Sequence, residues 1–190
     1  MGEITVCIPV FNAAKTLLAC VERLVVQDQT EDLPVLIYDN GSRDGTIELV
    51  QAWINRHIPP GLKIQMKQYK QIPGGKSQNI PYMRGNLARD VKTPYLFWLD
   101  ADVIIPPRTL NNLLADFKAD ETLELYGVRY DPRCDHVQMG ATIMRTEIAQ
   151  KVQWRWGEFC DCKTLATDLV TMGKRTDVHP ALQATHLHFL

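Results

Sequence analysis

The first 120 residues alternate between short apolar runs and segments in which apolar residues recur at helical spacing. Apolar runs occupy Ile4–Ile8, Pro34–Tyr38 and Tyr95–Leu99, and each is followed by an amphipathic helical pattern. Lys63–Lys67 alternates polar and apolar residues, which is typical of an edge strand. This strand–helix order predicts an α/β fold in which a mostly parallel central sheet carries helices on both faces.

The periodic signal is weaker after residue 120. Leu123–Val128 and Val137–Met144 have the composition of strands, and Leu165, Leu169 and Met172 predict a helix that ends at Gly173. We interpret this part as a small C-terminal antiparallel extension of the same domain, so residues 1–190 are expected to form one domain.

Composition excludes several classes of protein. The 190 residues are 45% hydrophobic and 23% charged, which suits a folded domain with a core. The net charge of −1 argues against a nucleic-acid-binding protein, which needs a basic surface. The sequence contains neither an apolar run of the roughly 18 residues that span a membrane nor a signal-peptide pattern at its start.

The cysteines favour a reducing, cytoplasmic compartment. There are five, an odd number, and Cys7 and Cys20 fall in predicted core positions. Cys160 and Cys162 form a C-x-C pair, but no second Cys or His pair at zinc-finger spacing accompanies it. We therefore do not expect a structural zinc ion.

Polar residues collect where three of the predicted strands end. The segments are Pro9–Asn12, Asp39–Thr46 and Asp100–Asp102. Ligands of parallel sheets bind beyond the carboxyl ends of the strands, so these segments are expected to meet at one edge.

Asp100 and Asp102 are the most informative pair. In an extended segment both carboxylates would point to the same side, and a divalent cation such as Mg²⁺ or Mn²⁺ would offset their repulsion. The alternative is a simple turn after the strand, since Asp favours turns. Asp39 has the same two interpretations: a turn residue before Asn40-Gly41, or an acceptor of hydrogen bonds from a nucleoside.

Taken together, the three segments resemble the GT-A glycosyltransferases, and most closely the inverting glycosyltransferase family 2. That family carries a P-x-[YF]-N segment, a D-[DN]-G-S-x-D-G-T turn and an apolar strand ending in D-x-D. Here these are Pro9–Asn12, Asp39–Thr46 and Leu99–Val103, and the resemblance covers residues 3 to about 119.

The resemblance implies a Rossmann-like domain with a nucleotide-sugar-binding half, residues 1–103, and an acceptor-side half, residues 104–190. It implies that the donor is bound by Pro9, Val10, Phe11, Asn12, Asp39, Asn40, Asp100 and Ala101. Lys76 and Arg84 are candidates for holding phosphate, or else exposed helix charges. The metal ligands implied are Asp102 and a late histidine, for which we name His188 first and His186 as the alternative.

An acidic residue at the start of a helix serves as general base in this family. Counting back from Gly173 places Asp161 there, with Glu158 and Asp168 as second candidates. Asp161 is equally suited to cap that helix. Trp154 could stack on an acceptor sugar or fill the core.

The expected function is that of an inverting glycosyltransferase. It would use a nucleotide-diphospho-sugar, with a UDP-sugar as the default, a divalent metal (Mn²⁺ or Mg²⁺) and a carboxylate base. The acceptor would be a glycan, a lipid-linked glycan or a protein, and peripheral contact with a membrane stays open. The alternative is a non-catalytic nucleotide-sugar-binding or glycan-binding module of the same fold.

Overall fold

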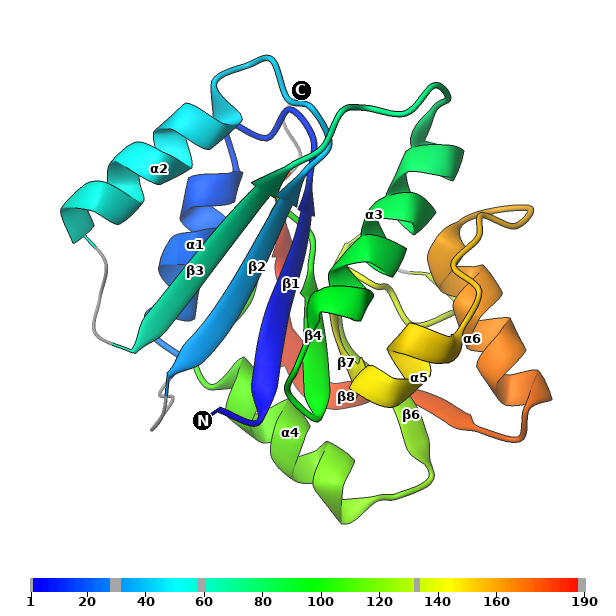
Figure 1. The fold of residues 1–190 in the computed structure, drawn as a ribbon. Helices are drawn as coiled ribbons and strands as arrows, with labels where there is room; N and C mark the ends of the chain where they lie inside the picture. The colour runs from blue at the N-terminus through cyan, green and yellow to red at the C-terminus, as the bar shows by residue number, and fades with distance from the viewer. Residues whose placement is uncertain (1, 28–31, 58–60, 132–133, 188–190) are drawn as a thin grey trace.

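The computed structural model describes residues 2–27, 32–57, 61–131 and 134–187, which form an α/β fold (Figure 1). Its main sheet has the strand order β3-β2-β1-β4-β7-β6-β8. The strands are β1 (Ile4–Val10), β2 (Leu33–Asp39), β3 (Leu62–Gln68), β4 (Tyr95–Leu99), β6 (Leu123–Arg129), β7 (Ala141–Arg145) and β8 (Arg175–Gln183). Neighbouring strands are parallel except on the two sides of β7, which is antiparallel to both β4 and β6. The mostly parallel sheet predicted from the sequence is confirmed.

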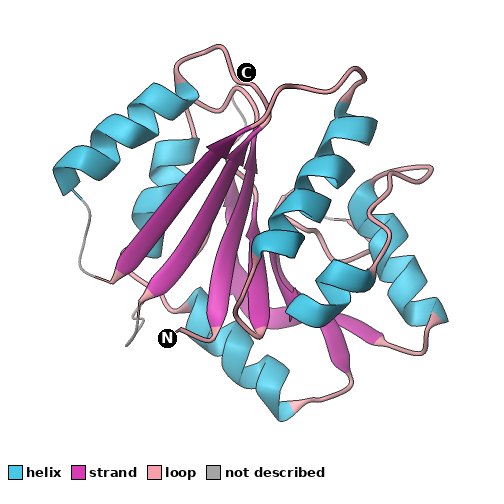
Figure 2. Ribbon diagram, viewed as in Figure 1, coloured by secondary structure: helices cyan, strands magenta, loops and turns pink. Residues whose placement is uncertain are grey.

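Helices cover both faces of this sheet (Figure 2). They are α1 (Leu17–Leu24), α2 (Thr46–His57), α3 (Lys76–Asp90), α4 (Thr109–Ala119), α5 (Thr146–Lys151) and α6 (Asp161–Thr171). One core cluster contains buried residues of α1, α2 and α4, and the other contains those of α3, α5 and α6. None of these described helices has both the length and the apolar composition that crossing a bilayer requires.

Strand β4 shows why the two cores form. Phe97 and Leu99 belong to one core cluster, and Leu96 and Trp98 belong to the other. Successive side chains of a strand point to opposite faces, so a strand covered on both faces is apolar at every position. This accounts for the unbroken apolar run of β4 and places its carboxyl end in the middle of the sheet.

The C-terminal half differs in part from the sequence-based expectation. The small antiparallel sheet is confirmed: it pairs β5 (Val103–Ile104) with β9 (Thr185–His186). The strand expected over Val137–Met144 is shorter, and α5 and β8 were not predicted. Strand β8 is mostly half-buried or exposed and contains Pro180, so it lacks an apolar pattern. Strand β3 is an edge strand, as its alternating pattern predicts.

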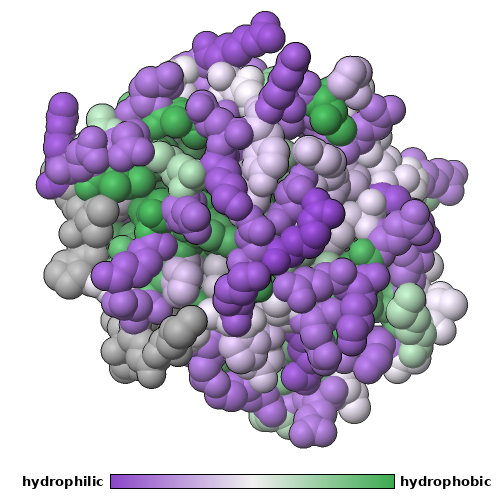
Figure 3. All heavy atoms as spheres, in the orientation of Figure 1, coloured by the Kyte–Doolittle hydropathy of each residue, from purple (hydrophilic) through white to green (hydrophobic). Residues whose placement is uncertain are grey.

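In the orientation of Figure 1 the surface is largely hydrophilic, with apolar side chains gathered over α2 and β3 (Figure 3). Two surface pockets lie elsewhere, beside β6 and β8. One, of about 270 Å³, is lined in part by Arg129, His136 and Asp177, and the other, of about 650 Å³, in part by Asp116, Tyr126 and Arg175. Neither includes the three polar segments at the strand ends.

Candidate functional site

The register of the sheet brings the three polar segments to one edge. In the parallel pairs, Val10 of β1 lies opposite Asp39 of β2, and Cys7 of β1 lies opposite Trp98 of β4. Strand β1 therefore stands between the strands that end in Asp39 and Leu99. The loops that follow all three strands emerge at the same edge, as predicted, and we call this edge the rim.

Asp39 shapes the turn that follows it. Its side chain is fully buried and accepts hydrogen bonds from the backbone N–H groups of Gly41 (3.1 Å) and Ser42 (3.0 Å) and from the Ser42 hydroxyl. Gly41 has φ of +79°, a conformation that favours glycine. The turn interpretation of Asp39 is thus confirmed, and its predicted contact with a nucleoside stays a prediction.

Hydrogen bonds join this turn to the loop after β1. The Asn12 N–H donates to Ser42 Oγ (2.8 Å), and the Arg43 N–H donates to Asn12 Oδ1 (2.9 Å). Asn12 has φ of +49°, which Asn tolerates better than most residues. The loop after β1, which would face a nucleoside, is therefore held by the Asp39–Thr46 turn. In the same loop, Phe11 is 46% exposed.

Asp44 and Thr46 complete the connection. Asp44 Oδ2 accepts from the Ala14 N–H (3.0 Å), and its other oxygen accepts from the N–H (3.1 Å) and hydroxyl of Thr46. The Ala13 N–H donates to Thr46 Oγ1 (2.9 Å). Desolvation acts to raise the pKa of Asp44, but these hydrogen bonds outweigh it and lower that pKa below its ordinary value.

Asn40 supports the loop that leads into α3. It is buried, and its Nδ2 donates to Asn79 Oδ1 (2.9 Å), while Asn79 Nδ2 donates to the carbonyl oxygens of Gly74 (2.8 Å) and Gly75 (3.0 Å). Asn40 Oδ1 is buried without a hydrogen-bond partner among the described residues. Lys76 is the first residue of α3 and is exposed, which agrees with its interpretation as an exposed helix charge.

The D-x-D segment is a turn and is not extended. Strand β4 ends at Leu99, and the Val103 N–H donates to the Asp100 carbonyl (3.1 Å), so Asp100–Val103 closes a turn around half-buried Ala101 and Asp102. The expectation that the two carboxylates share one side of an extended segment is therefore wrong. They bind different partners: Asp100 contacts Arg84, and Asp102 contacts His186.

His186 lies at the rim because β9 pairs with β5. Its Nε2 is 3.1 Å from Asp102 Oδ2, and the Leu187 N–H donates to the Asp102 carbonyl (2.7 Å). Its ring also lies 5.4 Å, between centroids, from that of Tyr130. The structure thus brings His186 to the D-x-D segment, while His188, the predicted ligand, lies outside the described residues.

Arg84 is the link between the D-x-D segment and α6. Its Nη2 lies 3.1 Å from Asp100 Oδ1, and its Nε lies 2.7 Å from Asp161 Oδ2. Arg84 is 3% exposed and packs over the Trp98 ring, so its interpretation as an exposed helix charge is wrong. Arg84 Nη1 is buried without a hydrogen-bond partner among the described residues.

The charges of this cluster act on one another. Burial raises the pKa of Asp100, Arg84 counteracts that rise, and the like charges of Asp102 and Asp161 add to it. Desolvation acts to lower the pKa of Arg84, but the charges of Asp161 and Asp100 outweigh it and raise that pKa overall, so the guanidinium stays cationic. The loop beyond β6 approaches closely here: a Cβ at Gly140 would lie 2.6 Å from Asp100 Oδ2.

Asp161 is the first residue of α6 and does not cap it. Cys160 holds the N-cap position, where its sulfur accepts the Lys163 N–H (3.2 Å). Of the second candidates for a base, Asp168 pairs with Arg155 (2.8 Å) and Glu158 is exposed. Trp154 packs against Trp98 with ring centroids 5.1 Å apart, so it belongs to the core.

At the rim, the Asp102 carboxylate lies beside the imidazole of His186. Arg84 connects this segment to the buried carboxylate of Asp161 and holds that carboxylate in place. Sequence reasoning named Asp102 and Asp161 as candidates, but it could not show that Arg84 joins Asp161 to Asp100. It also missed a second cluster, made by His136, Cys160 and Cys162, because the signal is a C-x-H pair and a C-x-C pair far apart in the chain.

Comparison with known proteins gives a family match. Residues 5–167 match the model of the family described as glycosyl transferase family 2. The chain is 28% identical over 120 residues to a chondroitin synthase of Escherichia coli, and 26% identical over 120 residues to a hyaluronan synthase of Pasteurella multocida. Each alignment covers 63% of this chain but only 16% and 11%, respectively, of those longer proteins.

Solved structures share the fold. The mannosyltransferase PcManGT from Pyrobaculum calidifontis, in complex with GDP-Man and Mn²⁺, superposes with a TM-score of 0.83 at 21% identity, over 97% of this chain and 56% of that one. S. aureus TarS 1–349 in complex with UDP-GlcNAc superposes with a TM-score of 0.71 at 16% identity, over 100% of this chain and 59% of that one. The fold is therefore the Rossmann-like GT-A fold.

Proposed function

Because the chain belongs to glycosyl transferase family 2, we propose that it transfers a sugar from a nucleotide-diphospho-sugar to an acceptor hydroxyl, with inversion at the anomeric carbon. The observation that carries the proposal is the buried contact of Arg84 with both Asp100 and Asp161. It joins the D-x-D segment, where the donor diphosphate would bind, to the carboxylate that would act on the acceptor.

The donor would lie along the rim. Exposed Phe11 and the loop held by Asn12 and Ser42 would face the nucleoside, with Asp39 holding the turn beneath them. The relatives PcManGT and TarS bind GDP-Man and UDP-GlcNAc, which supports a nucleoside diphosphate as the carrier. A UDP-sugar stays the default for this chain.

Asp102 and His186 fit a divalent cation. A carboxylate oxygen and an imidazole nitrogen 3.1 Å apart are ligands that Mn²⁺ accepts, and 44% of the Asp102 side chain is exposed. PcManGT, which has the same fold, is in complex with Mn²⁺, and this supports the use of a divalent cation. When bound, such an ion would supply positive charge that offsets the negative charge growing on the departing diphosphate.

Asp161 would act as the general base. It would accept the proton of the acceptor hydroxyl while that oxygen forms a bond to the anomeric carbon, and the bond from that carbon to the diphosphate oxygen breaks. A single displacement of this kind inverts the anomeric centre, as in inverting glycosidases. Arg84, whose Nε lies 2.7 Å from Asp161 Oδ2, would hold that carboxylate in position.

Donor hydrolysis tests the proposal without knowledge of the acceptor. The protein is incubated with UDP-GlcNAc, UDP-Glc or GDP-Man, with and without Mn²⁺, and the release of nucleoside diphosphate is measured beside the melting temperature. We expect one donor to raise the melting temperature and to be slowly hydrolysed in Mn²⁺. Stabilisation without release of diphosphate would instead indicate a binding module, and neither effect with any nucleotide sugar would refute the proposal.

A further inference from the structure

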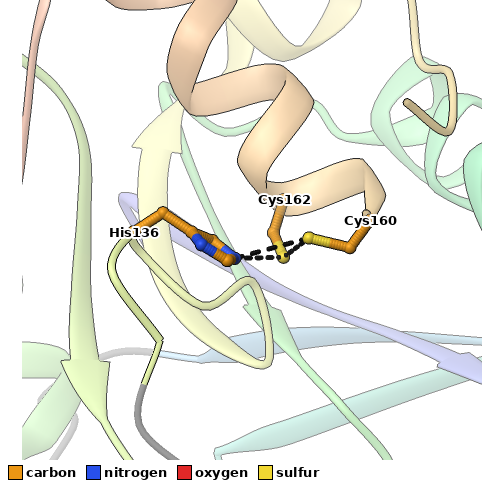
Figure 4. Close-up of side chains that lie close together, drawn as sticks. All are labelled: His136, Cys160 and Cys162. Atoms are coloured by element: carbon orange, nitrogen blue, oxygen red, sulfur yellow. Dashed lines mark hydrogen bonds between the residues drawn. The ribbon is translucent and has the colours of Figure 1, made fainter. Parts of the chain in front are cut away.

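A second cluster of ligand-type side chains lies next to Asp161, on the side of the loop between β6 and β7. The Nε2 of His136 is 3.1 Å from Cys162 Sγ and 3.4 Å from Cys160 Sγ, and the two sulfurs are 2.8 Å apart (Figure 4). The three side chains come from two segments and converge on one point. Two sulfurs and one imidazole nitrogen are the donors that structural zinc sites use.

The surroundings of the cluster orient these donors. His136 Nδ1 lies 2.8 Å from Asp135 Oδ1, and Asp135 Oδ2 lies 2.9 Å from Lys163 Nζ. A hydrogen bond from Nδ1–H to a carboxylate leaves the lone pair of Nε2 directed at the sulfurs, the arrangement that orients zinc-bound histidines. The Lys163 N–H, which donates to Cys160 Sγ, would stabilise a thiolate at that position.

Cys134 is the candidate for a fourth donor. It stands two residues before His136 on the same exposed loop, as Cys160 stands two residues before Cys162. The chain therefore offers two short pairs, Cys134-x-His136 and Cys160-x-Cys162, for one tetrahedral site.

We propose that His136, Cys160, Cys162 and Cys134 bind one structural zinc ion. Soft thiolates with imidazole select zinc over the oxygen-preferring Mg²⁺ and Mn²⁺. The site is thus chemically distinct from Asp102 and His186 at the rim, and its existence does not depend on the proposed function.

A Cys160–Cys162 disulfide is the competing interpretation. Its bond length would be about 2.05 Å, and it would leave His136 and its carboxylate partner without a role. The 2.8 Å separation of the sulfurs lies between a disulfide bond and the wider spacing of two thiolates on one tetrahedral zinc, so it does not decide between them. The imidazole nitrogen, however, faces both sulfurs. The convergence of a third donor favours the metal.

The zinc ion would position the proposed base, a consequence that does rest on the proposed function. Cys160 and Cys162 stand on either side of Asp161, whose carboxylate contacts Arg84. The ion would tie the start of α6 to the loop between β6 and β7, and the Gly140 carbonyl at the end of that loop accepts the Asp100 N–H (3.0 Å). The ion would therefore restrain Asp161 through the start of α6 and Asp100 through the loop between β6 and β7.

The test measures metal in the full chain, purified without chelators. We expect about one zinc ion per chain, and near none in His136→Ala or Cys162→Ser. Cys20→Ala, which removes a buried thiol of the other core cluster, and His186→Ala, which removes the rim imidazole, are matched controls that keep the zinc. A fully oxidised Cys160–Cys162 pair by mass spectrometry, or zinc lost equally in Cys20→Ala or His186→Ala, would overturn the proposal.

Cobalt substitution identifies the ligands. Tetrahedral Co²⁺ bound by thiolates absorbs in the near ultraviolet, with an intensity that scales with the number of thiolates. We expect Cys134→Ser to lose about a third of that absorption. Unchanged absorption would remove Cys134 from the site. A chelator should lower the melting temperature of the wild type but not that of Cys162→Ser, so this readout stays informative if no transferase activity is found.

Discussion

Arg84 Nε and Asp161 Oδ2 lie 2.7 Å apart, in a contact that buries nearly all of both side chains. The two residues are 77 positions apart in the chain, one in α3 and the other at the start of α6. The pair joins the half of the domain that would bind a nucleotide to the half that would meet an acceptor.

Removing the guanidinium should destabilise the fold. Arg84→Ala would leave Asp100 and Asp161 close together without a counter-charge, and breaking a buried pair costs about 3–5 kcal/mol. Urea denaturation of the variant measures the loss. Arg155→Ala, which breaks a partly exposed pair with Asp168, is the control and should cost about 0–1 kcal/mol. Equal losses in the two variants would contradict a special role for the buried contact.

Replacing the proposed base should separate turnover from donor binding. In Asp161→Asn we expect turnover to fall by about 10²–10⁴-fold, the usual contribution of general base catalysis, while the donor still raises the melting temperature. Asp168→Asn, on the same helix but paired with the partly exposed Arg155, should retain turnover. A folded Asp161→Asn variant with normal turnover would remove the assignment.

Metal-dependent donor binding should require Asp102 and His186. In Asp102→Asn and His186→Gln we expect Mn²⁺ to lose its effect on the donor-induced rise in melting temperature, because each variant removes one ligand atom. Asp116→Asn is the matched control: Asp116 contacts His179 at 3.5 Å, and that pair lies away from the rim. An undiminished Mn²⁺ effect in both rim variants would place the metal elsewhere.

The loss of folding free energy at low pH should depend on Asp44. Its pKa lies below the ordinary 3.8, because hydrogen bonds from Thr46 and Ala14 outweigh desolvation. The unfolded chain binds the proton more readily, so this contribution is present above pH 3.8 and is lost as the pH falls through the lower, folded-state pKa. Unfolding by urea at a series of pH values should show a flatter acid limb in Asp44→Asn. If the free energy of unfolding depended on pH in the same way in the variant and the wild type, protonation of Asp44 would make no contribution to stability, contrary to this prediction.

The turn of Asp39–Thr46 shows how far the sequence alone reaches. Its hydrogen bonds run between neighbours, or to the loop after the adjacent strand, so residue types and spacing suffice to identify it. The same holds for β4, whose apolar run predicts burial on both faces. Local chemistry and periodicity thus determined the parallel half of the sheet and the edge at which ligands would bind.

Tertiary structure decided the partners of the charged and sulfur-bearing residues. Arg84 sits in a helix of weakly amphipathic sequence, and only the packing of α3 against α6 turns it from a surface charge into a buried link. The pairing of β9 with β5 likewise brings His186 to Asp102, and the loop between β6 and β7 brings His136 to Cys162. These contacts join segments distant in the chain, and no periodicity encodes them, because side-chain direction at such points is set by how whole elements pack.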